Sequence, residues 1–137
     1  MVADEFFKYQ HDFAITTSWI TEVQPGSSSQ VHSHYNSLIS GVYYFDTYDE
    51  FSSDIEFINP LTKFQSFWIE PKEPSLACST LWTLPPRDKQ LIFFPSYLEH
   101  RVAIHRGDET RYSLAFNIVP TGLIGGADSS YNNEWFK

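Results

Sequence analysis

Gly26-Ser-Ser-Ser-Gln-Val-His32-Ser-His34 is a short polar segment with two histidines two residues apart. In an extended chain these two side chains point to the same side, about 7 Å apart, so both imidazoles can reach one metal ion. The segment Phe94-Pro-Ser-Tyr-Leu-Glu-His100 supplies a third histidine at the start of a later strand. Three ligands on one side leave the other side open, as a non-haem Fe(II) centre that binds a co-substrate and O2 requires. The alternative is that His32 and His34 are surface neighbours by chance.

The sequence around these segments is typical of an all-β protein. Pro, Gly, Ser, Asn and Asp interrupt it roughly every 8 to 12 residues, and aromatic and β-branched residues fill the intervals, as in β-sandwiches and barrels. With 137 residues, we expect one domain over 1–137, with a core at about 13–119 and a tail at 121–137.

Charge and cysteine content exclude several classes of protein. The net charge is −8 and no stripe of Lys and Arg is present, so we expect no nucleic-acid partner. Residues 1–20 have no basic and apolar leader pattern, and no run of 18 apolar residues occurs. We therefore predict a soluble cytoplasmic protein without membrane association. Cys78 is the only cysteine, which excludes internal disulfides and thiolate zinc clusters.

Alternation and turn signals predict the strands. The expected strands are Phe13–Val23, Gln30–His34, Leu38–Phe45, Asp54–Ile58, Ser75–Leu84, Gln90–Phe94, His100–His105 and Arg111–Val119. The last two are predicted to form a hairpin across residues 106–109. Gly41, in the middle of its strand, indicates close approach of a ligand or of a crossing strand.

The strand that begins at Arg111 has a polar face. Arg111, Ser113, Ala115 and Asn117 alternate with larger apolar residues, so the polar set is expected to face inward. An inward arginine needs an anionic partner, because an unpaired buried charge is very costly. Its planar guanidinium suits a bidentate carboxylate. That carboxylate belongs either to a bound molecule or to an internal residue such as Asp46.

Several motifs in this order resemble one family. They are His32-Ser33-His34, Asn36-Ser37, Ser40-Gly41-Val42-Tyr43-Tyr44, Phe94-Pro95-Ser96 with His100, and the run from Arg111 to Asn117. Together they resemble the small bacterial and phage branch of the 2-oxoglutarate/Fe(II)-dependent oxygenase superfamily, over about residues 19–119. The resemblance implies a double-stranded β-helix, also called a cupin-like jelly-roll.

The resemblance also implies an activity and a set of site residues. The activity is that of a dioxygenase, such as a hydroxylase, that couples oxidation of a substrate to decarboxylation of 2-oxoglutarate to succinate and CO2. His32, His34 and His100 match the positions of the metal ligands, although His34 stands where most of the superfamily has Asp or Glu. Tyr44, Arg111 and Ser113 match the residues that bind the distal carboxylate of 2-oxoglutarate.

Three questions stay open at this point. Asp46 is an alternative to His34 as the third ligand. A three-histidine site is also the pattern of cupin thiol dioxygenases, which do not use 2-oxoglutarate. A non-catalytic, metal-bearing jelly-roll could instead bind a ligand in a groove. Its candidate aromatic residues would be Trp19, Trp68, Trp82 and Tyr97.

The sequence says least about the primary substrate and the assembly. Acidic residues between Asp46 and Asp54 favour a neutral or cationic substrate, such as a small molecule or a peptide side chain, although solvated loop charge explains them equally well. In so short a chain a partner subunit, as in a homodimer, could close the site, and Trp135-Phe136 is the predicted docking element.

Overall fold

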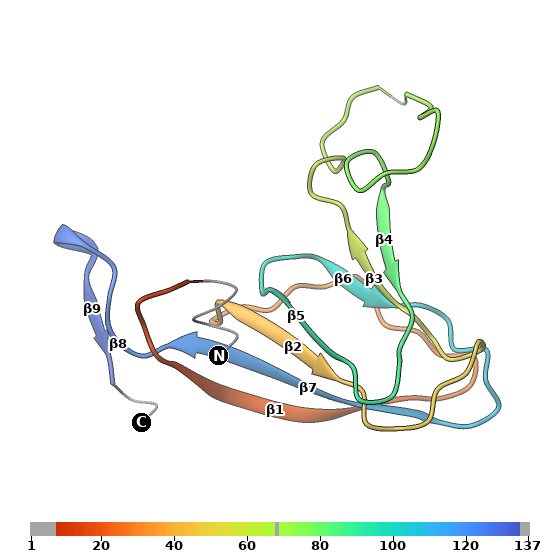
Figure 1. Cartoon of the computed structure of the whole chain (residues 1–137), viewed down its shortest axis with the longest axis horizontal. Helices are drawn as coiled ribbons and strands as arrows, with labels where there is room; N and C mark the ends of the chain where they lie inside the picture. Colours follow the sequence, from red (N-terminus) through yellow and green to blue (C-terminus); the bar gives the residue numbers. More distant parts are fainter. Residues whose placement is uncertain (1–7, 68, 135–137) are drawn as a thin grey trace.

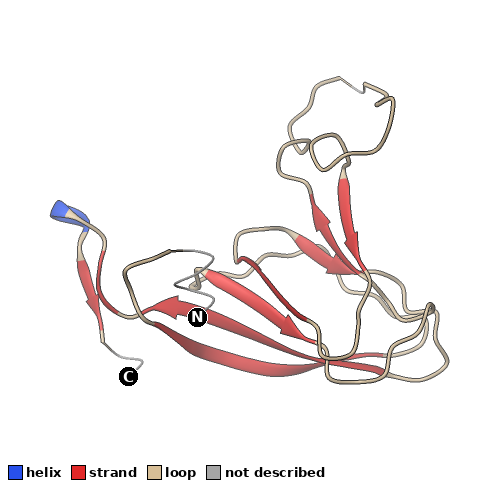
Figure 2. Cartoon of the chain, in the orientation of Figure 1, coloured by secondary structure: helices blue, strands red, loops and turns tan. Residues whose placement is uncertain are grey.

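The chain folds into two antiparallel β-sheets that face each other, in a computed structural model that describes residues 8–67 and 69–134. The elements are β1 (Phe13–Val23), β2 (Ile39–Tyr43), β3 (Ile55–Ile58), β4 (Leu81–Leu84), β5 (Leu91–Pro95), β6 (His100–Val102), β7 (Arg111–Pro120), β8 (Gly122–Ile124), the short 3₁₀ helix η2 (Ala127–Ser129) and β9 (Tyr131–Asn133). Figure 2 shows that η2 is the sole helical turn among the described residues.

The larger sheet has the strand order β1-β7-β2-β5. Its central strand, β7, pairs with β1 from Val23 opposite Arg111 to Phe13 opposite Pro120, and with β2 on its other side. β7 is therefore held on both edges, which fixes the direction of each of its side chains. Its polar face points into the molecule, as the alternation predicts.

The smaller sheet has the order β4-β3-β6. The chain passes from one sheet to the other after β2, β4, β5 and β6. As a result β1, β2, β5 and β7 lie in the larger sheet, and β3, β4 and β6 in the smaller one (Figure 1). This is the double-stranded β-helix that the sequence motifs imply. A separate hairpin of β8 and β9 extends beyond the end of β7.

Three expected strand assignments differ from the structure. The segment Gln30–His34 is not a continuous strand but forms a single bridge, His32 with His100, because its flanking amides bond to Val102 and Ser96 outside a regular ladder. The predicted hairpin between β6 and β7 is wrong, since β6 pairs with β3 while β7 pairs with β1 and β2. Only Leu81–Leu84 of the range 75–84 is a strand, because residues 75–79 form a turn.

The core lies between the two sheets. It consists of the buried side chains Val42, Tyr44, Ile55, Phe57 and Phe94. The rings of Phe57 and Phe94 meet edge to face, 5.0 Å apart, so aromatic packing joins β3 to β5. This contact places the start of β6, which neighbours β3, beside β5, where the rings of His100 and Phe94 lie 4.7 Å apart.

Gly41 is required by a neighbouring strand and not by a ligand. A Cβ atom at this position would lie 2.3 Å from the ring of Phe116 on β7. Phe116 lies directly opposite Gly41 in the same sheet, so the close contact comes from a side chain of the paired strand and not from a crossing strand. Gly26 has a different role: it adopts φ +78° in a turn closed by the Ser27 amide and the Gln24 carbonyl, a conformation that favours glycine.

The β3–β4 connection projects away from the sheets, at the top of Figure 1. Its exposed large apolar side chains are Leu61, Phe64, Phe67, Ile69 and Leu76. Trp68 and Trp135-Phe136, which the sequence suggests for binding or docking, lie outside the described residues. The homodimer stays a prediction.

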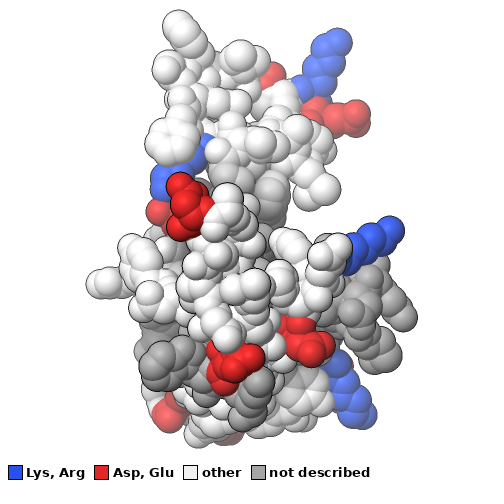
Figure 3. All heavy atoms as spheres, turned by 90° about the vertical axis from the view of Figure 1, so that its left-hand side faces the viewer, with Lys and Arg blue, Asp and Glu red and all other residues white. Residues whose placement is uncertain are grey.

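The surface is lightly charged on the face shown in Figure 3, where the Lys and Arg side chains stand apart from one another and form no continuous stripe. Within residues 8–67 and 69–134, no helix has the length and apolar character to span a membrane.

Candidate metal centre

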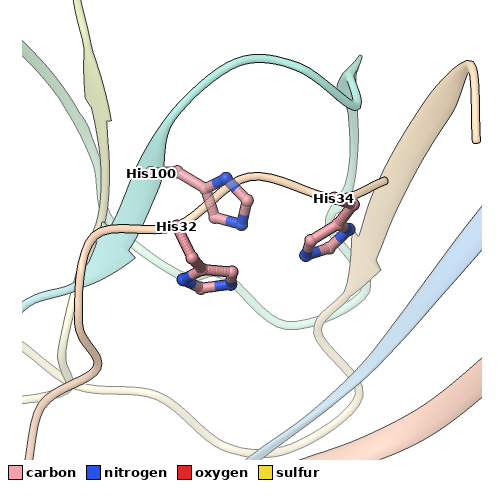
Figure 4. Close-up of side chains that lie close together, drawn as sticks. All are labelled: His32, His34 and His100. Atoms are coloured by element: carbon pink, nitrogen blue, oxygen red, sulfur yellow. The ribbon is translucent and has the colours of Figure 1, made fainter. Parts of the chain in front are cut away.

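Three histidines from two neighbouring segments meet at one end of the space between the sheets. His32 and His100 are bridge partners: each backbone amide donates to the other residue's carbonyl, at 3.0 and 2.9 Å. His34 follows on the same side of the chain as His32. One ring nitrogen of each of the three residues lies within 4.8 Å of the others, and Figure 4 shows these atoms facing a common space.

The outer nitrogens of the rings all have hydrogen-bond acceptors. Nδ1 of His32 lies 2.8 Å from the carbonyl of Gln30, and Nδ1 of His100 lies 2.9 Å from that of Leu98. Because a carbonyl can only accept, both Nδ1 atoms carry the proton. Nδ1 of His34 meets side chains instead, those of Ser40 and Asn117. The Nε2 lone pairs of His32 and His100 are consequently free for a metal ion, which is the usual arrangement of metal-binding histidines.

The environment keeps the inner rings neutral. Burial lowers the pKa of His100 to about 4, against the opposing effect of the hydrogen bond to the Leu98 carbonyl. Burial also lowers the pKa of His34, which the hydrogen bond to Asn117 partly offsets. Neutral imidazole is the form that binds metal. The donor set therefore fits a divalent transition metal at neutral pH.

A cavity of about 170 Å³ connects the histidines to the predicted carboxylate-binding residues. Its lining includes all three histidines together with Tyr44, Arg111 and Ser113. Most of the remaining wall is apolar. It includes Trp19, Val42, Ile55, Phe94 and Val102. The six residues named from the sequence thus line one cavity. Arg111 contributes a positive charge to this cavity, apart from the three histidines.

Arg111 is buried without an anionic partner. Its side chain is 3% exposed, and its Nε and Nη1 atoms have no hydrogen-bond partner among the described residues. It forms no ion pair in that part of the chain. Its guanidinium lies over the ring of Tyr44, 5.0 Å from the centroid. The carboxyl group of Asp54 interacts with Arg111 through charge, without forming an ion pair. Because an unpaired buried cation is costly, an anion bound beside the guanidinium would stabilise it.

Two hydroxyl groups accompany Arg111. The Tyr44 hydroxyl is fully buried and has no partner among the described residues. Burial raises the pKa of Tyr44 to about 12, against the opposing charge of Arg111, so the group is a hydrogen-bond donor at neutral pH. Ser113 is also buried and lies two residues from Arg111 on the same face of β7. Two neutral donors beside a cation suit a carboxylate.

Asp46 is not part of the histidine cluster. It lines a larger hollow of about 680 Å³ between residues 46–52 and 105–109, to which Arg111 also contributes. Its carboxylate accepts a hydrogen bond from the amide of Thr47. Neither sequence alternative for Asp46, as third ligand or as ion-pair partner of Arg111, has a corresponding contact in the structure.

Three further residues belong to the site: Trp19, which the sequence suggested only for a ligand-binding groove, and Ser40 and Asn117, which were not assigned to the metal centre. Trp19 lies edge-on to His34, with ring centroids 5.6 Å apart, and forms part of the cavity wall. Ser40 and Asn117 bond to His34. The alternation of β7 did place Asn117 on the inner face, but nothing in the sequence connected it with a particular histidine.

Comparison with known proteins identifies the family. Residues 17–117 match the model of a protein family described as "putative 2OG-Fe(II) oxygenase", where 2OG is 2-oxoglutarate. The chain belongs to this family. The match includes all six candidate site residues. No curated protein matches the sequence.

Solved structures with the same fold are considerably longer. An oxidoreductase of the 2OG-Fe(II) oxygenase family from Burkholderia pseudomallei has a TM-score of 0.63 and 13% identity, over 85% of this chain and 49% of that one. The α-ketoglutarate-dependent carbocyclase SnoK from nogalamycin biosynthesis gives 0.58 and 13%, over 77% and 49%. A Pseudomonas putida prolyl-4-hydroxylase gives 0.55 and 16%, over 86% and 59%. The chain thus spans about half the length of these proteins.

Proposed function

We propose that this protein is an Fe(II)- and 2-oxoglutarate-dependent dioxygenase that hydroxylates its substrate. One observation carries the proposal: a buried, unpaired Arg111 and three histidines with free Nε2 atoms line the same cavity. A metal ligand set alone would fit many proteins. The anion site beside it fits a metal-chelating keto acid with a second carboxylate.

Each residue has a distinct part in binding. His32, His34 and His100 would hold Fe(II) through Nε2, with their Nδ1 protons directed at acceptors behind them. Arg111 would bind the distal carboxylate of 2-oxoglutarate, assisted by the hydroxyls of Tyr44 and Ser113. Apolar walls such as Val42, Ile55 and Phe94 limit water around these groups, which strengthens the charge interactions.

The charges of the ligand set and the co-substrate are complementary. Three neutral imidazoles leave the metal with its full charge of +2. The two carboxylates of 2-oxoglutarate carry −2, one of them opposite Arg111. When bound, iron and the keto acid supply the oxidising chemistry: O2 converts 2-oxoglutarate to succinate and CO2 and leaves one oxygen atom in the hydroxylated product.

The size of the cavity favours a substrate that enters by a single group. A volume of about 170 Å³ is below the roughly 300–1,000 Å³ of pockets that enclose drug-sized ligands. With 2-oxoglutarate inside, the primary substrate would present one side chain at the mouth, next to the partly exposed Trp19. The net charge of −8 disfavours anionic substrates. A neutral or cationic peptide side chain meets both conditions.

The first experiment tests the co-substrate. Under anaerobic conditions, Fe(II) and 2-oxoglutarate added to the protein should give a weak visible charge-transfer band, and admission of O2 should give succinate. The band should be absent in His100→Ala. Oxygen consumption that does not need 2-oxoglutarate would favour a cupin-type dioxygenase. Ligand binding that persists after chelation of metal would favour a non-catalytic binder.

The second experiment tests the substrate class. Short neutral or cationic peptides should stimulate succinate formation more than acidic peptides of the same length. Trp19→Ala should reduce that stimulation without changing the affinity for 2-oxoglutarate. Stimulation by small metabolites alone would contradict the peptide assignment and leave the co-substrate assignment intact.

A further inference from the structure

We propose that Asn117 and Ser40 are positioning residues that make His34 a metal ligand, by holding its proton on Nδ1. The inference rests on the proposed metal site and concerns how this chain replaces the carboxylate found in most of the superfamily. Nδ1 of His34 lies 2.8 Å from Oδ1 of Asn117 and 2.7 Å from Oγ of Ser40.

His34 differs from the other two histidines in the partner of its Nδ1 atom. His32 and His100 each direct Nδ1 to the carbonyl two residues earlier in the chain. The corresponding carbonyl for His34 is that of His32, which accepts the amide of His100 at 2.9 Å. Nδ1 of His34 is directed instead at the side chains of Ser40 and Asn117.

A chain of serine hydroxyls fixes the direction of the hydrogen bonds. Ser37 donates to Oγ of Ser96 at 2.8 Å, and Ser96 and Ser40 are also 2.8 Å apart. Ser40 in turn donates to Oδ1 of Asn117, at 2.8 Å. Since each hydroxyl has one proton, Ser96 donates to Ser40 and Ser40 donates to Asn117. Each of the three serine hydroxyls therefore donates its proton to a partner other than His34.

The orientation of the Asn117 amide completes the argument. In the structure Nδ2 donates to Oγ1 of Thr17 at 3.3 Å, and Oδ1 is the atom that faces His34. An Nδ1 atom without a proton would bring two lone pairs together at 2.8 Å. Only the Nδ1–H form satisfies both atoms, and in that form Nε2 faces the other histidines with its lone pair free.

The hydrogen-bond network fixes the position of the His34 ring as well as its tautomer. Ser40 and Ser96 are almost completely buried and sit on β2 and directly after β5, next to β7. Three neighbouring strands therefore determine where the His34 ring lies. The acceptors are uncharged, so they fix the ring without adding negative charge to the site.

The decisive experiment measures Co(II) affinity by competition with a chromophoric chelator, in the absence of 2-oxoglutarate. Asn117→Ala should weaken Co(II) binding about 10- to 100-fold, as loss of an outer-shell partner typically does. Asn117→Asp keeps an acceptor oxygen and should bind Co(II) at least as tightly as the wild type. The matched control is Asn133→Ala, which removes a buried asparagine bonded to the Pro120 carbonyl far from the site and should leave Co(II) affinity unchanged.

The outcomes separate this inference from the metal site itself. Equal Co(II) affinity in wild type and Asn117→Ala would overturn the positioning role while leaving the metal site in place. Absence of Co(II) binding by the wild-type protein would overturn both. A measurement without any variant guards against misfolding: long-range ¹H–¹⁵N spectra of the metal-free wild-type protein should show His34 with the proton on Nδ1. The Nε2–H form there would overturn the inference.

Discussion

Replacement of Arg111 by methionine should separate binding from stability, because this arginine is buried without a partner. The side chain is 3% exposed and two of its nitrogens have no acceptor among the described residues. Methionine has a similar length and no charge. We expect Arg111→Met to leave the metal-free protein as stable as the wild type or more stable, and to abolish tight binding of 2-oxoglutarate.

The expected sizes follow from the contacts of the guanidinium. Two buried nitrogen atoms without acceptors, Nε and Nη1, cost about 1–3 kcal/mol each. Loss of the cation–π contacts with Tyr44 at 5.0 Å and Tyr48 at 6.0 Å costs about 0.5–2 kcal/mol each. The central values leave a net stabilisation of about 1–2 kcal/mol. For 2-oxoglutarate, removal of one partner of a buried charge pair costs about 2–5 kcal/mol, which is a loss of affinity of roughly 30-fold or more.

The assays are urea unfolding of the metal-free protein and calorimetric titration of 2-oxoglutarate into the anaerobic Fe(II) protein. Arg101→Met is the matched control: Arg101 is half exposed and pairs with Glu56 at 2.6 Å, so we expect a loss of less than about 1 kcal/mol and unchanged 2-oxoglutarate affinity. A destabilisation of Arg111→Met by more than about 2 kcal/mol, with normal 2-oxoglutarate binding, would show that Arg111 is structural and refute the reasoning.

Three further predictions test the other groups of the cavity. Tyr44→Phe removes a buried hydroxyl without a hydrogen-bond partner among the described residues, so the free energy of unfolding should not fall. The affinity for 2-oxoglutarate, measured by calorimetry, should drop about 10-fold or more, which is the value of a hydrogen bond to a charged group. Unchanged affinity would show that Tyr44 is not part of the carboxylate site. His34→Asp should retain Fe(II) binding and lower 2-oxoglutarate affinity, because the metal charge falls from +2 to +1; loss of metal binding in titrations would contradict this. The pKa of His100 is about 4 in the folded protein against 6.5 ordinarily, so at pH values between these two the unfolded chain binds more protons than the folded one. The free energy of unfolding of the metal-free protein should therefore fall as the pH decreases from about 6.5 to 4. If His100→Gln shows the same pH dependence of stability, this histidine is not the cause of the fall.

The strands of the larger sheet could be predicted well from the sequence. β1 matches the expected Phe13–Val23 at both ends, because alternation, the Pro25-Gly26 turn and high β-propensity all agree there. β7 matches to within one residue. Its inner polar face was also predicted, since strong period-2 alternation determines which residues share a side.

The pairing of the strands in the smaller sheet could not be predicted in the same way. Residues 100–105 and 111–119 lie close in sequence with a turn between them, which normally indicates a hairpin. In the structure the intervening loop crosses from one sheet to the other. His105 is buried in that loop, where Nε2 donates to the carbonyl of Glu109 at 2.6 Å and Nδ1 accepts from the amide of Ser53. A crossing stabilised by such tertiary contacts leaves no local signal.

The candidate site was predicted through residue types and not through contacts. Histidines two apart and an arginine on an inner strand face are local patterns, so they could be found in the sequence. The acceptor for His34 could not, because Ser40 and Asn117 come from strands that are 77 residues apart in sequence. The bridge between His32 and His100 likewise depends on pairing that only the folded chain reveals.

The location of the six site residues bears on what a chain of this size can do alone. All six lie within residues 17–117, the part that matches the family. Tyr44, His100, Arg111 and Ser113 lie on strands or directly after one, whereas His32 forms an isolated bridge and His34 lies in the connection that follows it. The longer structures with this fold share about half of their length with the chain. In the proposed function, the residues for metal and co-substrate binding all come from this shared part. Selection of the primary substrate is left to the mouth of the cavity and to whatever lies against it, which is why Trp19 and the peptide assay test a question separate from that of Arg111.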